Sequence, residues 1–255
     1  MSERLRLEVG DDRIATVTID NPPVNALDQP LYVEIRELFT RLGDDERISA
    51  VILTGEGKHF CAGNDLDEFL SLTPENNGPR MKVIREAFFA IEDCAVPVIG
   101  ALRGVAVGSG LAVAASCDFC VAAQGALLGT PEVSVGIMGG AKHLARLVPE
   151  PVLRWMYLSA DPVPAEELLA YGSVLAVVPA EQLLDEARRR AEAIVRHSPV
   201  TVRFAKRALK DIEFMDRKNG YEFEQGLSGE LSSYDDAKEA VRAFFERREP
   251  RYTGT

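Results

Sequence analysis

The sequence has no long uninterrupted apolar run and no leader-like start. Its longest apolar stretch, residues 95–115, contains Pro97, Arg103 and several glycines, so a bilayer-spanning helix is not expected there. The first residues, MSERLRLEVGDD, are polar and charged, unlike a secretory signal peptide. The sequence therefore predicts no membrane association and a cytoplasmic location.

Positive charge is also scarce. The 255 residues include 29 Lys and Arg against 40 Asp and Glu, which gives a formal net charge of -11. Nucleic-acid binding depends on basic patches, so the composition argues against a nucleic-acid partner. Hydrophobic residues make up 46% of the chain, which is enough for a large buried core.

Cysteines are few, at Cys61, Cys94, Cys117 and Cys120. The last two form a C-x-x-C that closes a predicted helix, whereas redox pairs open one, where the helix dipole lowers the thiol pKa. No second C-x-x-C or C-x-x-H completes a metal site. We therefore expect reduced core thiols and no metal.

What the sequence does contain is an alternation of strand and helix patterns. Residues 5–9 and 13–19 alternate and predict a hairpin, while residues 50–55, 96–102 and 118–123 are short apolar runs typical of buried parallel strands. Asp28 is expected to cap a helix that ends at Gly43. The breaker-rich residues 73–80 predict a mobile loop before a helix from about 81 to 94. Helices dominate after about residue 139, so the fold class is α/β with a helical C-terminal portion.

Two glycine-rich loops each follow a buried strand. In GVAVGSGLAVAASCD (104–118), Gly108-Ser109-Gly110 opens an apolar helix, whose first N–H groups are free to bind an anion or an oxyanion. Close helix–strand packing is the alternative reason for these glycines. A dinucleotide fingerprint would need glycine where Val113 stands, and a nucleophile elbow would need it at Val107 and Leu111. HFCAGNDL (59–66) is the second loop, and the two are expected to face each other.

These segments, with NPPVNAL (21–27), TPEVSVGIMGG (130–140), AEELLAYGSVLAVVP (165–179) and SPVTVRFAKRAL (198–209), resemble the crotonase, or enoyl-CoA hydratase/isomerase, superfamily. The resemblance implies a spiral of β-β-α repeats (residues 1–195) with a helical C-terminal trimerisation region (196–255). It further implies a homotrimer or homohexamer that acts on acyl-CoA thioesters. Coenzyme A would be part of the substrate, and no separate cofactor or metal would be needed.

The resemblance also implies site residues. The backbone N–H groups of Asn64 and Ser109 would hold the thioester oxygen, and Ser109 departs from the glycine common there. Of the two glutamates that hold water in the hydratases, Glu132 is kept and the other is replaced by Ala112. The residues expected to contact coenzyme A are Val24, Ala26, Ala62, Gly63, Asp65, Leu66 and Gly108, with Asp65 also a helix cap.

One carboxylate beside an oxyanion hole suits a proton shuttle, so double-bond isomerisation is the first hypothesis. Hydration or a hydratase-lyase reaction is the second, and a non-catalytic acyl-CoA-binding protein is the third. His143 is either a second acid–base group or a partly buried helix histidine. Lys206 and Arg207 are either contacts to the 3′-phosphate of a neighbouring subunit's coenzyme A or ordinary surface cations.

Overall fold

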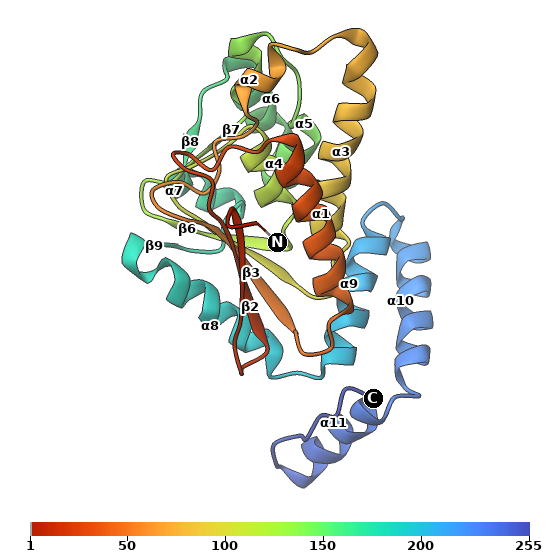
Figure 1. Cartoon of the computed structure of the whole chain (residues 1–255). Coiled ribbons are helices and arrows are strands. Elements are labelled where there is room, and N and C mark those ends of the chain that lie inside the picture. The colour runs from red at the N-terminus through yellow and green to blue at the C-terminus, as the bar shows by residue number, and fades with distance from the viewer. Residues whose placement is uncertain (1) are drawn as a thin grey trace.

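Two β-sheets lie among layers of helices in the body of the chain (Figure 1). The structure is a computed structural model, and it describes residues 2–255. The larger sheet has the strand order β1-β2-β3-β4-β6-β9, and the smaller sheet has the order β5-β7-β8. The larger sheet consists of β1 (Leu5–Val9), β2 (Ile14–Ile19), β3 (Ala50–Gly55), β4 (Val98–Leu102), β6 (Phe119–Ala123) and β9 (Val177–Val178), and the smaller of β5 (Val105–Val107), β7 (Leu127–Gly129) and β8 (Val163–Pro164).

Both faces of the larger sheet are buried, which explains the continuous apolar runs of its central strands. Only the β1–β2 pair is antiparallel in this sheet, and β2, β3, β4, β6 and β9 run parallel. Parallel strands need helices on both faces. One face packs against α8 (Leu183–Val195) through Leu183, Ala187 and Ala191.

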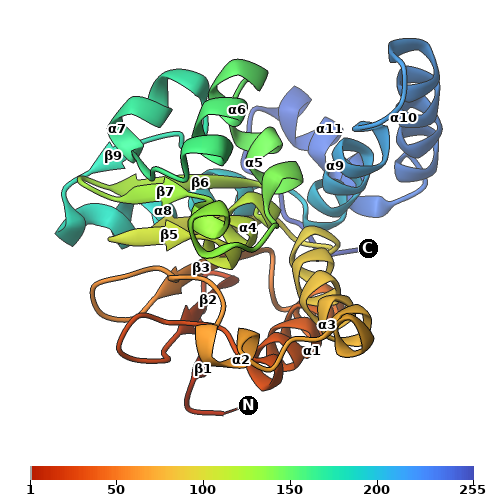
Figure 2. The same cartoon turned by 90° about the horizontal axis from the view of Figure 1, so that it is seen from above.

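The opposite face carries the main core, under α1 (Gln29–Asp44), α3 (Pro74–Glu92) and α4 (Ser109–Ser116). Seen from above, α1 and α3 lie side by side, and α4 lies against β5 (Figure 2). The remaining helices are the short α2 (Leu66–Phe69), α5 (Ala141–Leu147), α6 (Glu150–Ser159) and α7 (Ala165–Leu168), with 3-10 turns at Pro131–Val135, Leu169–Tyr171 and Ala180–Gln182. The predicted α/β class and the hairpin are confirmed.

The prediction of a loop at residues 73–80 is wrong. Helix α3 begins at Pro74, because the Thr73 hydroxyl accepts the Asn76 N–H while the Asn76 side chain accepts the Thr73 N–H. Pro74 occupies the first helical turn, where its missing N–H has no cost. Pro79 lies near the start of the helix and removes a single intrahelical bond. The helix at Asp28 is confirmed, since the Asp28 carboxylate accepts the Leu31 N–H at 2.9 Å.

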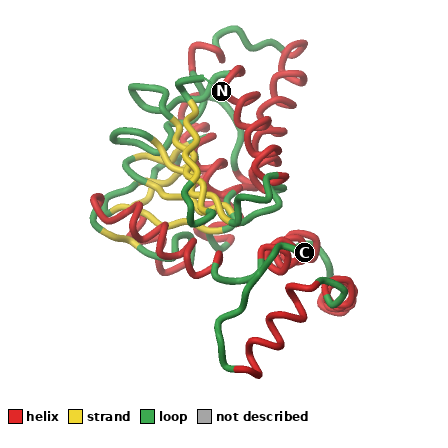
Figure 3. Tube along the Cα trace, turned by 60° about the horizontal axis from the view of Figure 1, so that its bottom comes forward, coloured by secondary structure: helices red, strands yellow, loops and turns green. Residues whose placement is uncertain are grey.

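The last helices are α9 (Pro199–Ile212), α10 (Arg217–Leu231) and α11 (Asp235–Glu246), of which α9 packs on the body while α10 and α11 project from it (Figures 1 and 3). Helix α9 is anchored by Lys206, whose Nζ donates to Asp118 at 2.8 Å and to the Val96 carbonyl at 3.0 Å. The predicted boundary at residue 195 coincides with the end of α8, although the division into two units stays a prediction. Within residues 2–255, no helix has both the length and the apolar character of a membrane span.

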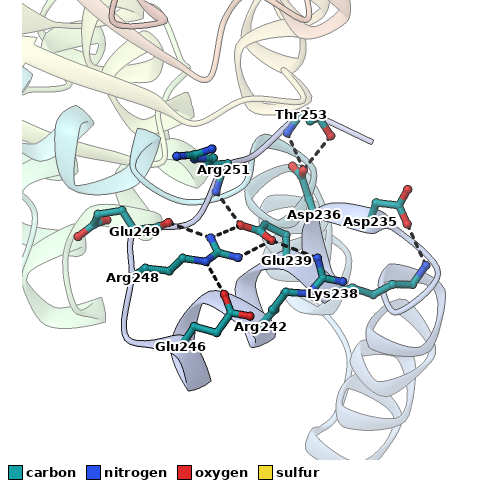
Figure 4. A network of polar contacts seen from close by, with 10 residues as sticks. All are labelled: Asp235, Asp236, Lys238, Glu239, Arg242, Glu246, Arg248, Glu249, Arg251 and Thr253. Atoms are coloured by element: carbon teal, nitrogen blue, oxygen red, sulfur yellow. Dashed lines mark hydrogen bonds and ion pairs between the residues drawn. The ribbon is translucent and has the colours of Figure 1, made fainter.

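The chain end folds back on α11 (Figure 4). The Glu239 carboxylate accepts two hydrogen bonds from the Arg248 guanidinium, at 2.6 and 3.0 Å, and one from the Arg251 N–H at 3.0 Å. The buried Asp236 carboxylate accepts the Thr253 N–H at 2.7 Å. This network fixes the terminal segment and leaves the apolar side chains of α11 uncovered.

Candidate active site

The strand-like segment 61–64 is held on one side by residues 24–27. The Ala62 N–H donates to the Val24 carbonyl at 3.0 Å, the Leu27 N–H to the Gly63 carbonyl at 2.8 Å, and the Asp65 N–H to the Leu27 carbonyl at 2.9 Å. Leu27 thus pairs with the residues on both sides of Asn64, as in a parallel bridge. The N–H of Asn64 itself therefore points away from Leu27.

The other side of the same segment is held by β5. The Cys61 N–H donates to the Val105 carbonyl, and the Val107 N–H donates to the Cys61 carbonyl, both at 3.1 Å. A Cβ atom on Gly110 would lie 2.1 Å from the Cys61 carbonyl oxygen, so the start of α4 packs directly on this segment. Gly110 therefore has a packing role, which was the alternative interpretation of the glycines.

The loop that carries the Asn64 N–H approaches the start of α4, which carries the Ser109 N–H, at Gly63. A Cβ atom on Gly63 would lie 3.3 Å from the Ser109 nitrogen and 3.0 Å from the Val107 oxygen. Ser109 is the first residue of α4, after Gly108 with φ 58°, and so its N–H has no intrahelical acceptor. Throughout the described chain, the N–H groups of Asn64 and Ser109 have no hydrogen-bond partner. This geometry suits an oxyanion hole.

Glu132 lies next to these donors on the 3-10 turn Pro131–Val135. A Cβ atom on Gly108 would lie 3.4 Å from its Oε1, and one on Gly140 would lie 3.6 Å from it. Its Oε2 is buried without a hydrogen-bond partner. Burial raises the pKa of Glu132 above the usual range of a glutamate. The carboxylate is thus a stronger base than that of an exposed glutamate, and once protonated it can return the proton.

Two cavities meet at this point. The larger, of about 890 Å³, extends between α3, α5 and Phe214, and the smaller, of about 110 Å³, opens past Ala62, Leu66 and Val135. Within residues 2–255 the residues that line both cavities are Asn64, Gly108, Ser109, Glu132 and Ile137. Of these, Glu132 alone carries a carboxylate. Ala112 lines the larger cavity, where the hydratases were expected to have their other glutamate.

The wall of the larger cavity carries several charges. Arg146 lies 3.6 Å from the Glu92 carboxylate and 3.8 Å from that of Glu213, so these two carboxylates share a cation. Arg85 and Lys142 also line the cavity, and neither forms an ion pair with any residue in the described part of the chain. The cavity therefore offers two cations that remain available to an occupant.

His143, the sequence's candidate for a second acid–base group, lies in the same cavity wall. It is half-buried on α5, and its ring meets the edge of Phe88 with centroids 5.1 Å apart. Burial, followed by the charge of Arg146, lowers the pKa of His143, so the imidazole is neutral at neutral pH. It faces the cavity without a charged partner.

The residues predicted to contact coenzyme A are placed in three ways. Ala62, Gly63, Leu66 and Gly108 line the smaller cavity. Asp65 caps α2 by accepting the Asp67 N–H at 3.0 Å. Val24 and Ala26 lie on the neighbouring segment, outside the walls of both cavities. No group of three or more His, Cys, Asp or Glu side chains in residues 2–255 is arranged to bind a metal ion.

The four cysteines are free thiols, and all are buried. Cys117 is the C-cap of α4, and its thiol donates to the Val113 carbonyl, while the Cys120 thiol donates to the Ala114 carbonyl. Burial raises the pKa of Cys61 to about 12, so this thiol beside the site stays protonated. The C-x-x-C is part of the core.

Sequence reasoning missed the cavity cations Arg85, Lys142 and Arg146, and it also missed Tyr32, which contacts a site residue from behind the cavity wall. Its hydroxyl donates to Asn64 Oδ1 at 2.7 Å, and it lies on the buried face of α1 with Leu31 and Ile35. In the sequence this position belongs to an amphipathic pattern and indicates only core. No sequence pattern indicates the role of its hydroxyl group, because the hydrogen-bond partner Asn64 lies 32 residues away.

Comparison with known proteins agrees with this geometry. The family model described as "Enoyl-CoA hydratase/isomerase" matches residues 10–255. The "(7aS)-7a-methyl-1,5-dioxo-2,3,5,6,7,7a-hexahydro-1H-indene-carboxyl-CoA hydrolase" of Rhodococcus jostii is 39% identical, with 94% of this chain and 93% of that protein covered. The "Short-chain-enoyl-CoA hydratase" of Clostridium acetobutylicum is 34% identical, with 93% of each chain covered.

A crystal structure of an enoyl-CoA hydratase from Bacillus anthracis superposes with a TM-score of 0.94 and 30% identity, covering 99% of this chain and 100% of that one. The predicted crotonase-like fold is therefore confirmed. The family match over almost the whole chain and the named relatives lead to one conclusion: the chain belongs to the enoyl-CoA hydratase/isomerase family and is an enzyme acting on CoA thioesters.

Proposed function

We propose that this enzyme moves a proton along the acyl group of a CoA thioester, with double-bond isomerisation as its reaction. The observation that carries the proposal is the junction of the two cavities, where two unpaired N–H groups lie beside a single half-buried carboxylate whose Oε2 has no hydrogen-bond partner. The N–H groups of Asn64 and Ser109 bind the thioester oxygen. Glu132 takes a proton from one carbon and returns it to another.

The energetics favour binding of the thioester oxygen by the two N–H groups and proton transfer by Glu132. Removing a proton next to a thioester carbonyl leaves an enolate, whose charge is on the oxygen held by the two N–H groups. Each such donor is worth about 3 kcal/mol in the transition state. Because burial raises the pKa of Glu132, its carboxylate is a stronger base than an exposed glutamate and also a competent acid once protonated.

Isomerisation is preferred over hydration because the water of a hydratase needs a second acid–base group. Ala112 supplies none, and the other carboxylates of the cavity, Glu92 and Glu213, pair with Arg146. Hydration or a hydratase-lyase reaction would require another group, of which His143 is the candidate. A protein that binds acyl-CoA without turnover is the remaining alternative.

A second candidate is hydrolytic ring opening of a CoA ester that carries a cyclic dione. Two observations favour it: the similarity to the Rhodococcus hydrolase, and a cavity of about 890 Å³ that has available cations at Arg85 and Lys142. Glu132 would take a proton from a water molecule as the water adds to a ring carbonyl, and cleavage of the bond between that carbonyl carbon and the α-carbon would release a carboxylic acid group and the same thioester enolate. Glu132 would then protonate that carbon, so both reactions use one site.

Coenzyme A itself is assigned to the smaller cavity, along the backbone of Ala62, Gly63 and Leu66.

We further propose that the chain forms a homotrimer or homohexamer through residues 196–255. Support comes from apolar side chains that the single chain leaves uncovered there, with Leu209 69%, Phe244 79% and Phe245 78% exposed. Such large apolar surfaces are normally buried in an interface. A cytoplasmic location is part of the same proposal.

One set of assays separates these reactions. A 3-enoyl-CoA should gain conjugated absorbance if the enzyme isomerises, and a 2-enoyl-CoA should lose it if the enzyme adds water. A CoA ester of a cyclic dione should gain the mass of one water if the ring is opened. Binding of all three with no change, and no exchange of α-hydrogen for deuterium from the solvent, would contradict every catalytic proposal.

A further inference from the structure

The side chains of both proposed oxyanion-hole residues meet at one buried phenol. The Tyr32 hydroxyl donates to Asn64 Oδ1 at 2.7 Å, and the Ser109 hydroxyl lies close enough to the same phenol to lower its pKa. Tyr32 is fully buried, and its ring meets the edge of Phe88 with centroids 5.9 Å apart. The phenol thus connects two residues that lie 45 positions apart in the chain.

We propose that Tyr32 is a positioning residue for the oxyanion hole, which keeps the side chains of Asn64 and Ser109 away from the thioester oxygen. The inference rests on the proposed function, because it needs the N–H groups of these two residues to bind that oxygen. Tyr32 lies outside the walls of both cavities and touches no substrate in this scheme.

The physical need for such a residue arises from the residue types at the two positions. An oxyanion hole uses backbone N–H groups, so any side chain at these positions must be directed elsewhere. The carboxamide oxygen of Asn64 is a good acceptor, and it lies on the residue whose N–H should bind the substrate. A released carboxamide oxygen would compete with the thioester oxygen for the two donors.

The Tyr32 phenol prevents this competition by satisfying the acceptor. Burial raises the pKa of Tyr32 well above its ordinary value, against the opposing effect of the nearby Ser109 hydroxyl, so the phenol stays a neutral donor. Its backbone is fixed as well, since the Tyr32 N–H donates to the Asp28 carbonyl at 3.1 Å near the capped start of α1. The Tyr32 hydroxyl therefore stays in place, and a rotation of the Asn64 side chain would break the hydrogen bond between them.

The test is a set of variants assayed on the substrate that the wild type turns over. Tyr32→Phe keeps the ring and removes the hydroxyl, and it should lower kcat by about tenfold or more with KM within about twofold, since only the transition state carries charge on the oxygen. Asn64→Ala keeps the N–H and removes the competing oxygen. The double variant should therefore recover at least most of the kcat that Tyr32→Phe loses.

Thr54→Val is the matched control, because it also removes one buried hydroxyl bond, from Thr54 to the Ala101 carbonyl at 3.0 Å, in the core strand β3. It should lower the melting temperature as much as Tyr32→Phe does and leave kcat unchanged. A purely structural Tyr32 would give additive losses in the double variant and would overturn the proposal, as would an unchanged kcat in Tyr32→Phe. A wild type that turns over no enoyl-CoA or cyclic CoA ester would instead overturn the proposed function.

Discussion

The two halves of the proposed site are built differently. On the donor side, the segment 61–64 has backbone hydrogen bonds to both of its neighbours, and Cys61, Gly63 and Ser109 are buried. On the acid side, residues 131–140 are mostly exposed, with Val135 at 55% and Met138 at 82%. The donor segment is therefore held by backbone hydrogen bonds on both sides, whereas the segment that carries Glu132 has few buried side chains to hold it.

The largest effect should come from the acid side. Glu132→Gln removes the one carboxylate at the cavity junction and should lower kcat by about a thousandfold, within the 10²–10⁴ range of general acid–base catalysis. Acyl-CoA binding, measured by calorimetry, should be almost unchanged, because the donors and the cavity remain. Steady-state kinetics with the active substrate gives kcat.

Glu213→Gln is the matched control, since this carboxylate lines the same cavity but pairs with Arg146. It should reduce kcat by less than about tenfold, as expected of a residue outside the chemistry. Equal losses in the two variants would show that the charge of the cavity, and not the position of Glu132, matters.

The donor side should respond to Gly63→Ala. The new Cβ would lie 3.0 Å from the Val107 oxygen and 3.3 Å from the Ser109 nitrogen, at a backbone φ of 98°. We expect kcat to fall by about a hundredfold, the loss typical of one misplaced oxyanion donor. Gly125→Ala separates backbone strain from contact, because Gly125 has a φ of 75° and an added Cβ there would meet no atom within 4 Å. Its kcat should stay at the wild-type value while its melting temperature falls.

A smaller effect is expected on the pH dependence of thermal stability, through the protonation of Glu132. Glu132 has a raised pKa in the folded chain, so the folded state binds its proton more tightly than the unfolded state. Its contribution to stability is therefore complete below the unfolded pKa and is lost as pH rises through the folded pKa. At pH 8, Glu132→Gln should melt higher than the wild type, by about 2 °C for each ~1 kcal/mol recovered.

That gain should shrink as the pH falls and vanish below the unfolded pKa of a glutamate, where both variants are neutral at this position. Thermal melts at pH 4, 6 and 8 measure it. In the wild type, kcat/KM should fall as pH drops through the raised pKa, because the base must start ionised. A pH-independent melting difference would mean that Glu132 is not buried in solution.

The comparison also explains which features the sequence could predict. The donor loops follow buried strands of five or six apolar residues, and these patterns are local, so their glycines and their meeting point were accessible from sequence. The helical start at Thr73 was missed because Pro79 and the polar run outweighed the Thr73–Asn76 capping pair. The two-residue strands β8 and β9 are fixed by partners distant in sequence and have no pattern of their own.

The site beyond the backbone donors was harder to predict. Tyr32 follows the apolar face of α1, and only the folded chain brings its hydroxyl to Asn64. The pairing of Arg146 with Glu92 and Glu213 likewise joins three helical segments. Which cations stay available in the cavity therefore follows from tertiary contacts and not from spacing.

The smallest expected effect tests whether the available cations of the larger cavity bind the far end of the acyl group. Arg85→Ala combined with Lys142→Ala removes the two available cations of the larger cavity. KM should rise by about tenfold for acyl groups that carry a distal oxygen, the loss of one exposed ionic contact of ~1 kcal/mol or slightly more. For a straight-chain acyl-CoA of equal length, KM should stay within about twofold. Lys82→Ala, a change on α3 at a residue paired with Glu86, is the control and should alter neither value. Equal changes for both substrates would assign the two cations to the coenzyme A phosphates, and the acyl cavity would then select by size alone.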